Sequence, residues 1–163
     1  MRSQQRRWPL PGDGPVASAP MSASTSFLLA VPYYSGVDHL RLTLASVLAQ
    51  DDPCWACVVV DDSPVDHGVG DVVVGLGDPR VTYRRNERNL GVAGAFNRCF
   101  ELAVESGAPL VSIVHADDLL EPSYVRVARA AHEREPDAAC VAPRVVVIGA
   151  GGAPSRTVPD TVK

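Results

Sequence analysis

Short, continuously apolar runs alternate along the chain with longer segments in which apolar residues recur every three or four positions. The runs that predict strands are residues 27–31, 57–60, 110–114 and 139–147. A further strand is expected at residues 81–83, which we favour over the apolar stretch at residues 72–74. Because these runs are continuous rather than alternating, they favour a sheet whose two faces are both covered by helices.

Three segments between the runs have the periodicity of amphipathic helices. The first is expected to be capped by Asp38 and to end before Pro53, and the second to stop at Gly107 and Pro109. Pro122 suits the first turn of the third helix. The predicted buried faces are Leu40, Leu44, Val47 and Leu48; Val92, Phe96, Cys99 and Ala103; and Tyr124, Val125, Ala128 and Ala131. Alternating strands and helices predict an α/β fold with an open, mostly parallel sheet.

The chain of 163 residues is long enough for one domain with a proper core. Residues 1–25 are rich in Pro, Ser, Ala and Gly without apolar periodicity, which predicts a flexible leader. We therefore expect the folded domain at residues 26–150 and a loop-like tail at residues 151–163.

Composition narrows the classes of partner. The formal net charge is −4, which disfavours a nucleic-acid binder because such proteins need a basic surface for the phosphates. No apolar run has the roughly 18 residues of a membrane span, and no apolar core of a signal peptide follows the N-terminal arginines. We expect a cytoplasmic protein, with peripheral membrane association left open. The four cysteines include one close pair, Cys54 and Cys57, and are interpreted as ordinary thiols.

Two acidic pairs follow predicted strands directly. Asp61 and Asp62 come after the run at residues 57–60, and Asp117 and Asp118 close the run at residues 110–114. Ligands of parallel sheets bind beyond the carboxyl ends of the strands, where both pairs are expected to lie. Adjacent carboxylates there suit Mg²⁺ or Mn²⁺ beside a diphosphate. The alternative for each pair is a turn or a helix cap, because Asp favours both.

Small residues fill the segment between the two acidic pairs. Residues 89–97 read NLGVAGAFN, which would let the backbone approach a ligand closely or would let a helix pack tightly on the sheet.

Taken in order, these motifs resemble the N-terminal part of the family 2 glycosyltransferases, which have the Rossmann-like, three-layer GT-A fold. The resemblance covers residues 27–148. Its matching positions are residues 31–34 in the opening strand and turn; Leu44, Ser46, Leu48 and Gln50 in the first helix; residues 60–63 in the uridine-binding turn; Asn89, Gly91, Val92 and Asn97; and Asp117, Asp118, Leu120 and Pro122 in the metal motif.

The resemblance implies metal-assisted transfer of a sugar from a nucleotide-diphosphate-sugar donor, usually with inversion, to a glycan, a lipid or a small molecule, as in cell-envelope polysaccharide synthesis. Asp61 and Asp62 would face the base and ribose, with Pro32 and Tyr33 lining the same pocket. The donor site would also include Asn89, Gly91, Asn97 and His115. Asp117 and Asp118 would serve the ribose, the diphosphate and the metal.

The sequence departs from the family pattern at three places. His115 stands where the metal motif commonly has an Asp, and imidazole can also ligate a metal or donate to a phosphate. No catalytic base is evident, with Asp160 the only late candidate. The signature of processive members appears at residues 4–8, at the wrong end of the chain, and is interpreted as coincidence.

These departures leave two functions open. We expect a fold truncated before its acceptor half, so that the alternative to an enzyme is a non-catalytic nucleotide-sugar-binding module. A truncated sheet would also expose an edge strand, which makes a homodimer conceivable.

Overall fold

Four parallel strands form the centre of the computed structural model, which describes residues 26–149, 152 and 154–157. The strands are β1 (Phe27–Tyr33), β2 (Trp55–Asp61), β3 (Val81–Arg85) and β4 (Leu110–Ile113). Their order in the sheet is β3-β2-β1-β4, so β1 and β2 are central. The predicted parallel α/β sheet is thus confirmed, including the choice of residues 81–83 as the third strand. The predicted flexible leader, residues 1–25, lies outside the described residues.

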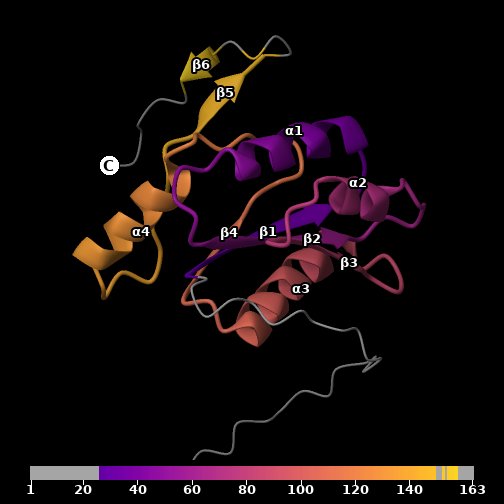
Figure 1. The fold of residues 1–163 in the computed structure, drawn as a ribbon, viewed down its shortest axis with the longest axis horizontal. Helices are drawn as coiled ribbons and strands as arrows, with labels where there is room; N and C mark the ends of the chain where they lie inside the picture. The colour runs from indigo at the N-terminus through magenta and orange to yellow at the C-terminus, as the bar shows by residue number, and fades with distance from the viewer. Residues whose placement is uncertain (1–25, 150–151, 153, 158–163) are drawn as a thin grey trace, which may run out of the picture.

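Helices cover both faces of the sheet, which gives three layers (Figure 1). The helices are α1 (Val37–Leu48), α2 (Val69–Gly75), α3 (Gly91–Ser106) and α4 (Tyr124–Arg134). The larger core cluster joins alternate residues of β1 and β2 to the buried faces of α1 and α2 and to Val125 of α4. The smaller cluster joins the intervening strand residues to Cys99 and Ala103 of α3. All seven residues of β2 are buried, as a strand covered on both faces requires.

The helix ends and buried faces agree with the sequence predictions only in part. The residue that caps α1 is Gly36, with φ of 85°, and no side chain caps this helix; Asp38 lies in its first turn, so the prediction that Asp38 is the cap is wrong. Gly107 ends α3 in the left-handed conformation, as predicted. On α3 the buried residues are Ala95, Cys99 and Ala103, whereas Val92 is 79% exposed, so the predicted buried face is shifted.

The last predicted strand differs most from the structure. Of residues 139–147, only Val146 and Val147 are in a strand, β5 (Val146–Ile148). This strand pairs antiparallel with β6 (Pro154–Thr157) in a separate two-stranded sheet. Residues 154–157 were expected in a loop-like tail and instead form β6. An apolar run predicts an extended backbone but does not specify which strand it pairs with.

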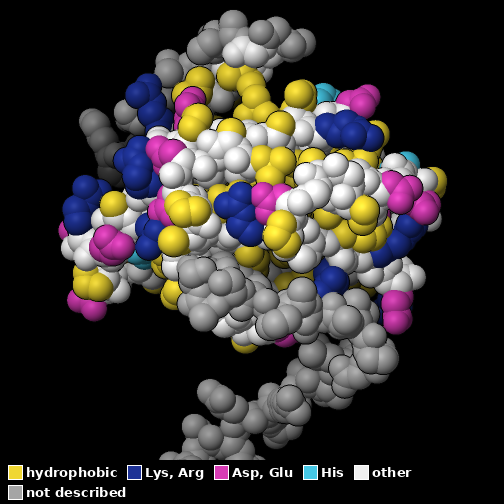
Figure 2. Space-filling model, in the orientation of Figure 1, with side chains coloured by type: hydrophobic (Ala, Val, Ile, Leu, Met, Phe, Trp, Pro, Cys, Tyr) yellow, Lys and Arg dark blue, Asp and Glu magenta, His cyan; other side chains and the backbone are white. Residues whose placement is uncertain are grey.

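Acidic and basic side chains are interspersed on the face seen in Figure 2. Ion pairs among the described residues include Arg126 with Asp51 and Arg129 with Asp52, which join the segment after α1 to α4. In the part of the chain that the structure describes, no helix has the length and apolarity needed to cross a membrane.

Candidate functional site

The two acidic pairs lie at the carboxyl ends of β2 and β4, on opposite sides of β1. Tyr33, the last residue of β1, is paired in register with Asp61, the last residue of β2. On the other side, β4 pairs with β1 as far as Ile113, and the amide of Val114 donates to the carbonyl of Ala30 at 2.9 Å. The predicted residues therefore lie together at the carboxyl-terminal end of the sheet, as the parallel topology requires.

Asp61 is fully buried and its carboxylate is used within the protein. It belongs to the set of β2 residues that face α1 and α2, because side chains alternate between the two faces of a strand. Its Oδ1 accepts from the amide of Ser63 at 2.9 Å, and its Oδ2 accepts from the hydroxyl of Tyr83 at 2.7 Å. Burial, together with this hydrogen bond, raises the pKa of Tyr83 to about 12. The pair is thus a neutral phenol donating to a carboxylate.

Asp62, only 4% exposed, organises the loop between β3 and α3. Its Oδ1 accepts from Asn86 Nδ2 and from the amide of Leu90, each at 2.8 Å. Its Oδ2 accepts from Asn89 Nδ2 at 3.1 Å, and the same nitrogen donates to the Asp62 carbonyl at 2.7 Å. Both carboxylate oxygens therefore have protein partners, which gives Asp62 a structural task beside the predicted contact with the base and ribose.

The loop held by Asp62 leads directly into α3. Gly91, the first residue of α3, has φ of 71°, a conformation that L side chains rarely adopt. One turn later, a Cβ added to Gly94 would meet the Cβ of Leu90 at 2.5 Å. The glycines of the predicted NLGVAGAFN segment are thus required by the backbone turn and by close packing within the helix start. Of the two predicted asparagines, Asn89 binds Asp62 and Asn97 is exposed on α3.

Tyr33 and His67 lie at the same carboxyl-terminal end of the sheet, on the side of α2. The Tyr33 hydroxyl and His67 Nδ1 are 3.0 Å apart, and their rings meet edge to face. Burial, reinforced by the charge of Asp61, raises the pKa of Tyr33. Pro32, half-buried, sits one residue earlier on the face toward α3. No role was assigned to His67 from the sequence, because its contact with Tyr33 spans 34 residues.

Asp117 and Asp118 are both exposed, in contrast with Asp61 and Asp62. They lie in a turn after β4 that is closed by a hydrogen bond from the Asp118 amide to the His115 carbonyl at 3.0 Å. Within the described residues, neither carboxylate takes part in a hydrogen bond or an ion pair with the protein. His115 is also exposed, and its ring lies 5.5 Å from that of Phe96, centroid to centroid. The first turns of α3 therefore reach from Asp62 to the turn after β4.

The donor set after β4 fits a divalent cation that is shared with a phosphate ligand. Within the described ranges, no three His, Cys, Asp or Glu side chains gather as a group that could hold a metal. A nucleotide-bound Mg²⁺ or Mn²⁺ takes only one or two carboxylates and completes its shell with phosphate oxygens and water. The free carboxylates of Asp117 and Asp118 match that requirement.

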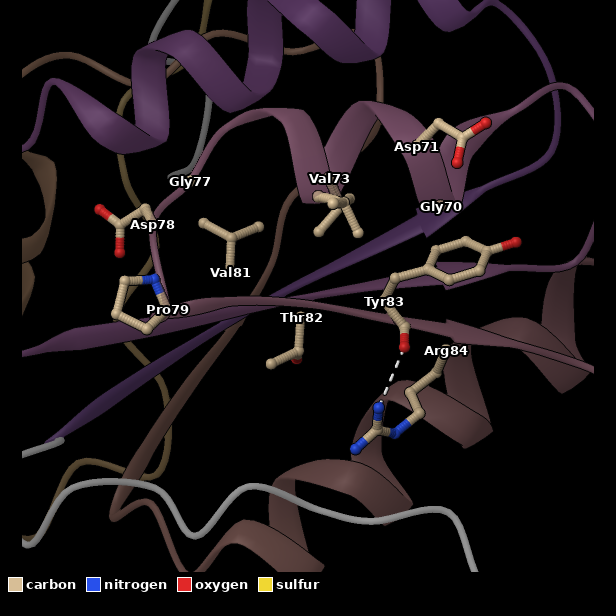
Figure 3. Close-up of a pocket in the computed structure, with 11 residues that line it drawn as sticks. Gly70, Asp71, Val73, Gly77, Asp78, Pro79, Val81, Thr82, Tyr83 and Arg84 are labelled. Atoms are coloured by element: carbon tan, nitrogen blue, oxygen red, sulfur yellow. Dashed lines mark hydrogen bonds between the residues drawn. The ribbon is translucent and has the colours of Figure 1, made fainter.

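A separate hollow lies beside β3, the strand at one side of the sheet, between this strand and α2 (Figure 3). Its volume is about 700 Å³, and Gly70, Tyr83 and Arg84 are among the residues that line it. Arg84 Nη1 donates there to the carbonyl of Tyr83 at 3.0 Å. None of the predicted site residues lines this hollow, so the strand ends remain the candidate site.

Sequence reasoning missed Tyr83 and Asn86, which bind the two carboxylates of the first acidic pair. Tyr83 ends the strand predicted at residues 81–83 and Asn86 follows it, but their partners lie 22 and 24 residues away along the chain. Cys54, Cys57 and Cys99 are buried or half-buried free thiols, as predicted, whereas Cys140 is exposed. Burial raises the pKa of Cys57 to about 12.

Comparison with known proteins adds a family and a set of related folds. The family model for glycosyl transferase family 2 matches residues 29–158. The uncharacterized protein MT1568 of Mycobacterium tuberculosis is 28% identical over 117 residues, which is 72% of this chain and 35% of the relative.

Solved structures with the same arrangement include TarS from S. aureus, with a TM-score of 0.57 and 25% identity over 69% of this chain and 20% of TarS. TarS in complex with UDP-GlcNAc gives a TM-score of 0.59 and 24% identity, covering 68% of this chain and 32% of that one. The mannosyltransferase PcManGT from Pyrobaculum calidifontis, solved in complex with GDP-Man and Mn²⁺, gives a TM-score of 0.55 and 23% identity. The match covers 82% of this chain and 38% of that one. The chain thus spans from about a fifth to somewhat over a third of the length of these relatives.

Proposed function

The chain belongs to glycosyl transferase family 2, and from this premise we propose that it binds a nucleotide-diphosphate-sugar donor and takes part in sugar transfer. The observation that carries the proposal is the pair of free, exposed carboxylates at Asp117 and Asp118, placed at the carboxyl end of a parallel strand. Carboxylates without a protein partner are available to a ligand, whereas those of Asp61 and Asp62 are already bonded.

A divalent cation at Asp117 and Asp118 would neutralise charge that builds on the leaving diphosphate. The same chemistry supports the choice of Mn²⁺ or Mg²⁺, since PcManGT was solved with Mn²⁺ beside GDP-Man. His115, exposed two residues before Asp117, is available to donate to a phosphate oxygen.

The nucleoside would lie between the ends of β1 and β2 and the start of α3. Pro32 and the loop held by Asp62 flank this region, and Gly91 brings the backbone of α3 close to it, whereas Tyr33 is 1% exposed on the face toward α2. Because Asp62 is 4% exposed and both its carboxylate and its carbonyl already accept hydrogen bonds, the exposed side chain of Asn89 would be the polar group offered to a ribose or base.

Transfer also needs a base that deprotonates the acceptor hydroxyl, and Asp160, the only late candidate in the sequence, lies outside the described residues. Inversion at the anomeric carbon, the acceptor, a cell-envelope product, a cytoplasmic setting, peripheral membrane association and a homodimer stay predictions. Donor binding is therefore the part of the function to test first, and it also tests the alternative of a non-catalytic binding module.

The test is calorimetric titration with UDP, GDP and dTDP, each with Mn²⁺ and with EDTA. We expect saturable binding that tightens with Mn²⁺, and a loss of that tightening by about tenfold or more in Asp117→Asn or Asp118→Asn. Asp137→Asn changes another exposed carboxylate after α4 and is the matched control. Equal Mn²⁺-dependent affinity in all variants would show that the metal site is elsewhere.

A further inference from the structure

Helix α1 presents three polar side chains to the segment that carries Asp117 and Asp118. Thr43, Ser46 and Gln50 are spaced by three and four residues along and just beyond the helix, which places them on one face. Thr43 is fully buried beside the apolar core residues Leu44 and Val47. A polar group in such a place costs stability unless it is hydrogen-bonded, so its partners indicate its task.

Two of these side chains bond on either side of the acidic pair. The Thr43 hydroxyl donates to the carbonyl of Ala116 at 2.9 Å, immediately before Asp117, and it also lies 3.2 Å from the carbonyl of His39 in its own helix. The Ser46 hydroxyl accepts from the amide of Leu120 at 3.1 Å, two residues after Asp118. The backbone on both flanks of the carboxylates is thus tied to one helix.

Gln50 binds farther along the same segment. Its Nε2 donates to the carbonyl of Glu121 and its Oε1 accepts from the amide of Val125, both at 2.9 Å. These bonds lie at the start of α4, together with a backbone bond from Asp51 to Pro122. Gln50 therefore binds the start of α4, whereas Thr43 and Ser46 bind the backbone of the turn that carries Asp117 and Asp118.

Besides these bonds, the turn is held by the hydrogen bond from the Asp118 amide to the His115 carbonyl and by the packing of Ala116 and Leu120 against the core. Between Ile113 and Tyr124 the chain forms neither helix nor strand, and the carboxylates of Asp117 and Asp118 are exposed. A divalent cation demands near-fixed distances to its oxygen ligands, so the backbone that carries those ligands has to be held before the ligand arrives.

We propose that Thr43 and Ser46 are positioning residues that hold the Asp117–Asp118 turn in the geometry that receives a divalent cation and a diphosphate. The inference rests on the proposed function, since it assigns these two hydroxyls a task only if the acidic pair binds metal and nucleotide. It makes no claim that either hydroxyl contacts the donor.

The decisive quantity is the ratio of nucleotide affinity with Mn²⁺ to that with EDTA. Thr43→Val and Ser46→Ala remove the bonds with little change in size, and Thr43→Ser restores the hydroxyl. Ser106→Ala is the matched control for Ser46→Ala, because each hydroxyl donates to the carbonyl three residues earlier at 2.7 Å and accepts from a backbone amide. Ser106 is the last residue of α3. Thermal unfolding of each variant shows how much stability is lost.

We expect Thr43→Val and Ser46→Ala to lower the ratio about tenfold, as removal of outer partners of metal ligands does. Affinity in EDTA should change less than twofold, and both Thr43→Ser and Ser106→Ala should keep the wild-type ratio. A wild-type ratio in Thr43→Val and Ser46→Ala, alongside its loss in Asp117→Asn, would overturn the positioning role alone. If the wild-type chain binds none of UDP, GDP and dTDP, the proposed function fails and the positioning role fails with it.

Discussion

Replacing Asp62 by Asn should destabilise the ligand-free protein, whereas the same change at Asp117 should leave its stability unaltered. The two residues differ in what surrounds an otherwise similar carboxylate at a strand end. Asp62 is 4% exposed and accepts from Asn86, Asn89 and the amide of Leu90. Asp117 is exposed and accepts no hydrogen bond within the described residues.

The size of the effect follows from the three bonds. Hydrogen bonds to a charged acceptor contribute about 1.5–3 kcal/mol each, and those to a neutral one about 0.5–1.5 kcal/mol. An amide at position 62 can keep its oxygen toward Asn86 and Leu90, but its NH₂ group then faces the NH₂ group of Asn89. The two kept bonds weaken by about 1–1.5 kcal/mol each and the third loses about 1.5–3 kcal/mol, so we expect the free energy of unfolding to fall by about 3.5–6 kcal/mol.

Urea unfolding followed by circular dichroism measures this loss, with Asp117→Asn as the matched control. The control should remain within about 0.5 kcal/mol of wild type, as exposed substitutions usually do. The variant should also unfold at a lower temperature, by about 2–4 °C for each kcal/mol in a protein of this size. If Asp62→Asn is as stable as Asp117→Asn, the carboxylate does not hold the loop in solution, and its bonds in the structure carry no net free energy.

Two further perturbations test the packing and charge at this edge. Gly94→Ala should destabilise the protein by about 1–3 kcal/mol, because the added Cβ would lie 2.5 Å from that of Leu90. Gly75→Ala has open space around the added Cβ and should be neutral or stabilise by about 0.5–1 kcal/mol. The midpoints of urea unfolding compare the two variants. Tyr83→Phe should be less stable than wild type at pH 8. This difference should shrink as pH rises from about 10 toward 12. The Tyr83 pKa is higher in the folded than in the unfolded protein, so the hydroxyl stabilises the fold fully below the unfolded value of 10.0 and loses this effect when it deprotonates. A constant difference in unfolding free energy over pH 8–11 would contradict the role of the Tyr83 hydroxyl.

The strands, their parallel arrangement and the place of the acidic pairs could be predicted because they depend on local patterns. A continuously apolar run such as residues 57–60 favours a strand covered on both sides, although the apolar stretch at residues 72–74 lies in α2. The topology then brings the strand ends to one edge without further information. The separate pairing of β5 with β6 could not be predicted, because its register depends on residues beyond the apolar run.

The difference between the two acidic pairs also lay beyond the sequence. Asp62 is satisfied by groups 24 to 28 residues away, and Asp61 by a hydroxyl 22 residues away. No local pattern states whether such partners exist, so both pairs looked like equal candidates for ligand binding. Only the contacts of each carboxylate distinguish a group that is already bonded from one that is free.

Burial explains why the two pairs have to differ. A carboxylate in a position as enclosed as that of Asp61 or Asp62 costs several kcal/mol unless hydrogen bonds replace its water, so these residues must be bonded before any ligand arrives. Asp117 and Asp118 keep their water because they are exposed, so they need no protein partner in the free state. On the proposed function, a divalent cation bound by these two carboxylates would remove the repulsion between them. The buried pair is therefore suited to shaping the site and the exposed pair to binding at it, although both follow strands of the same sheet.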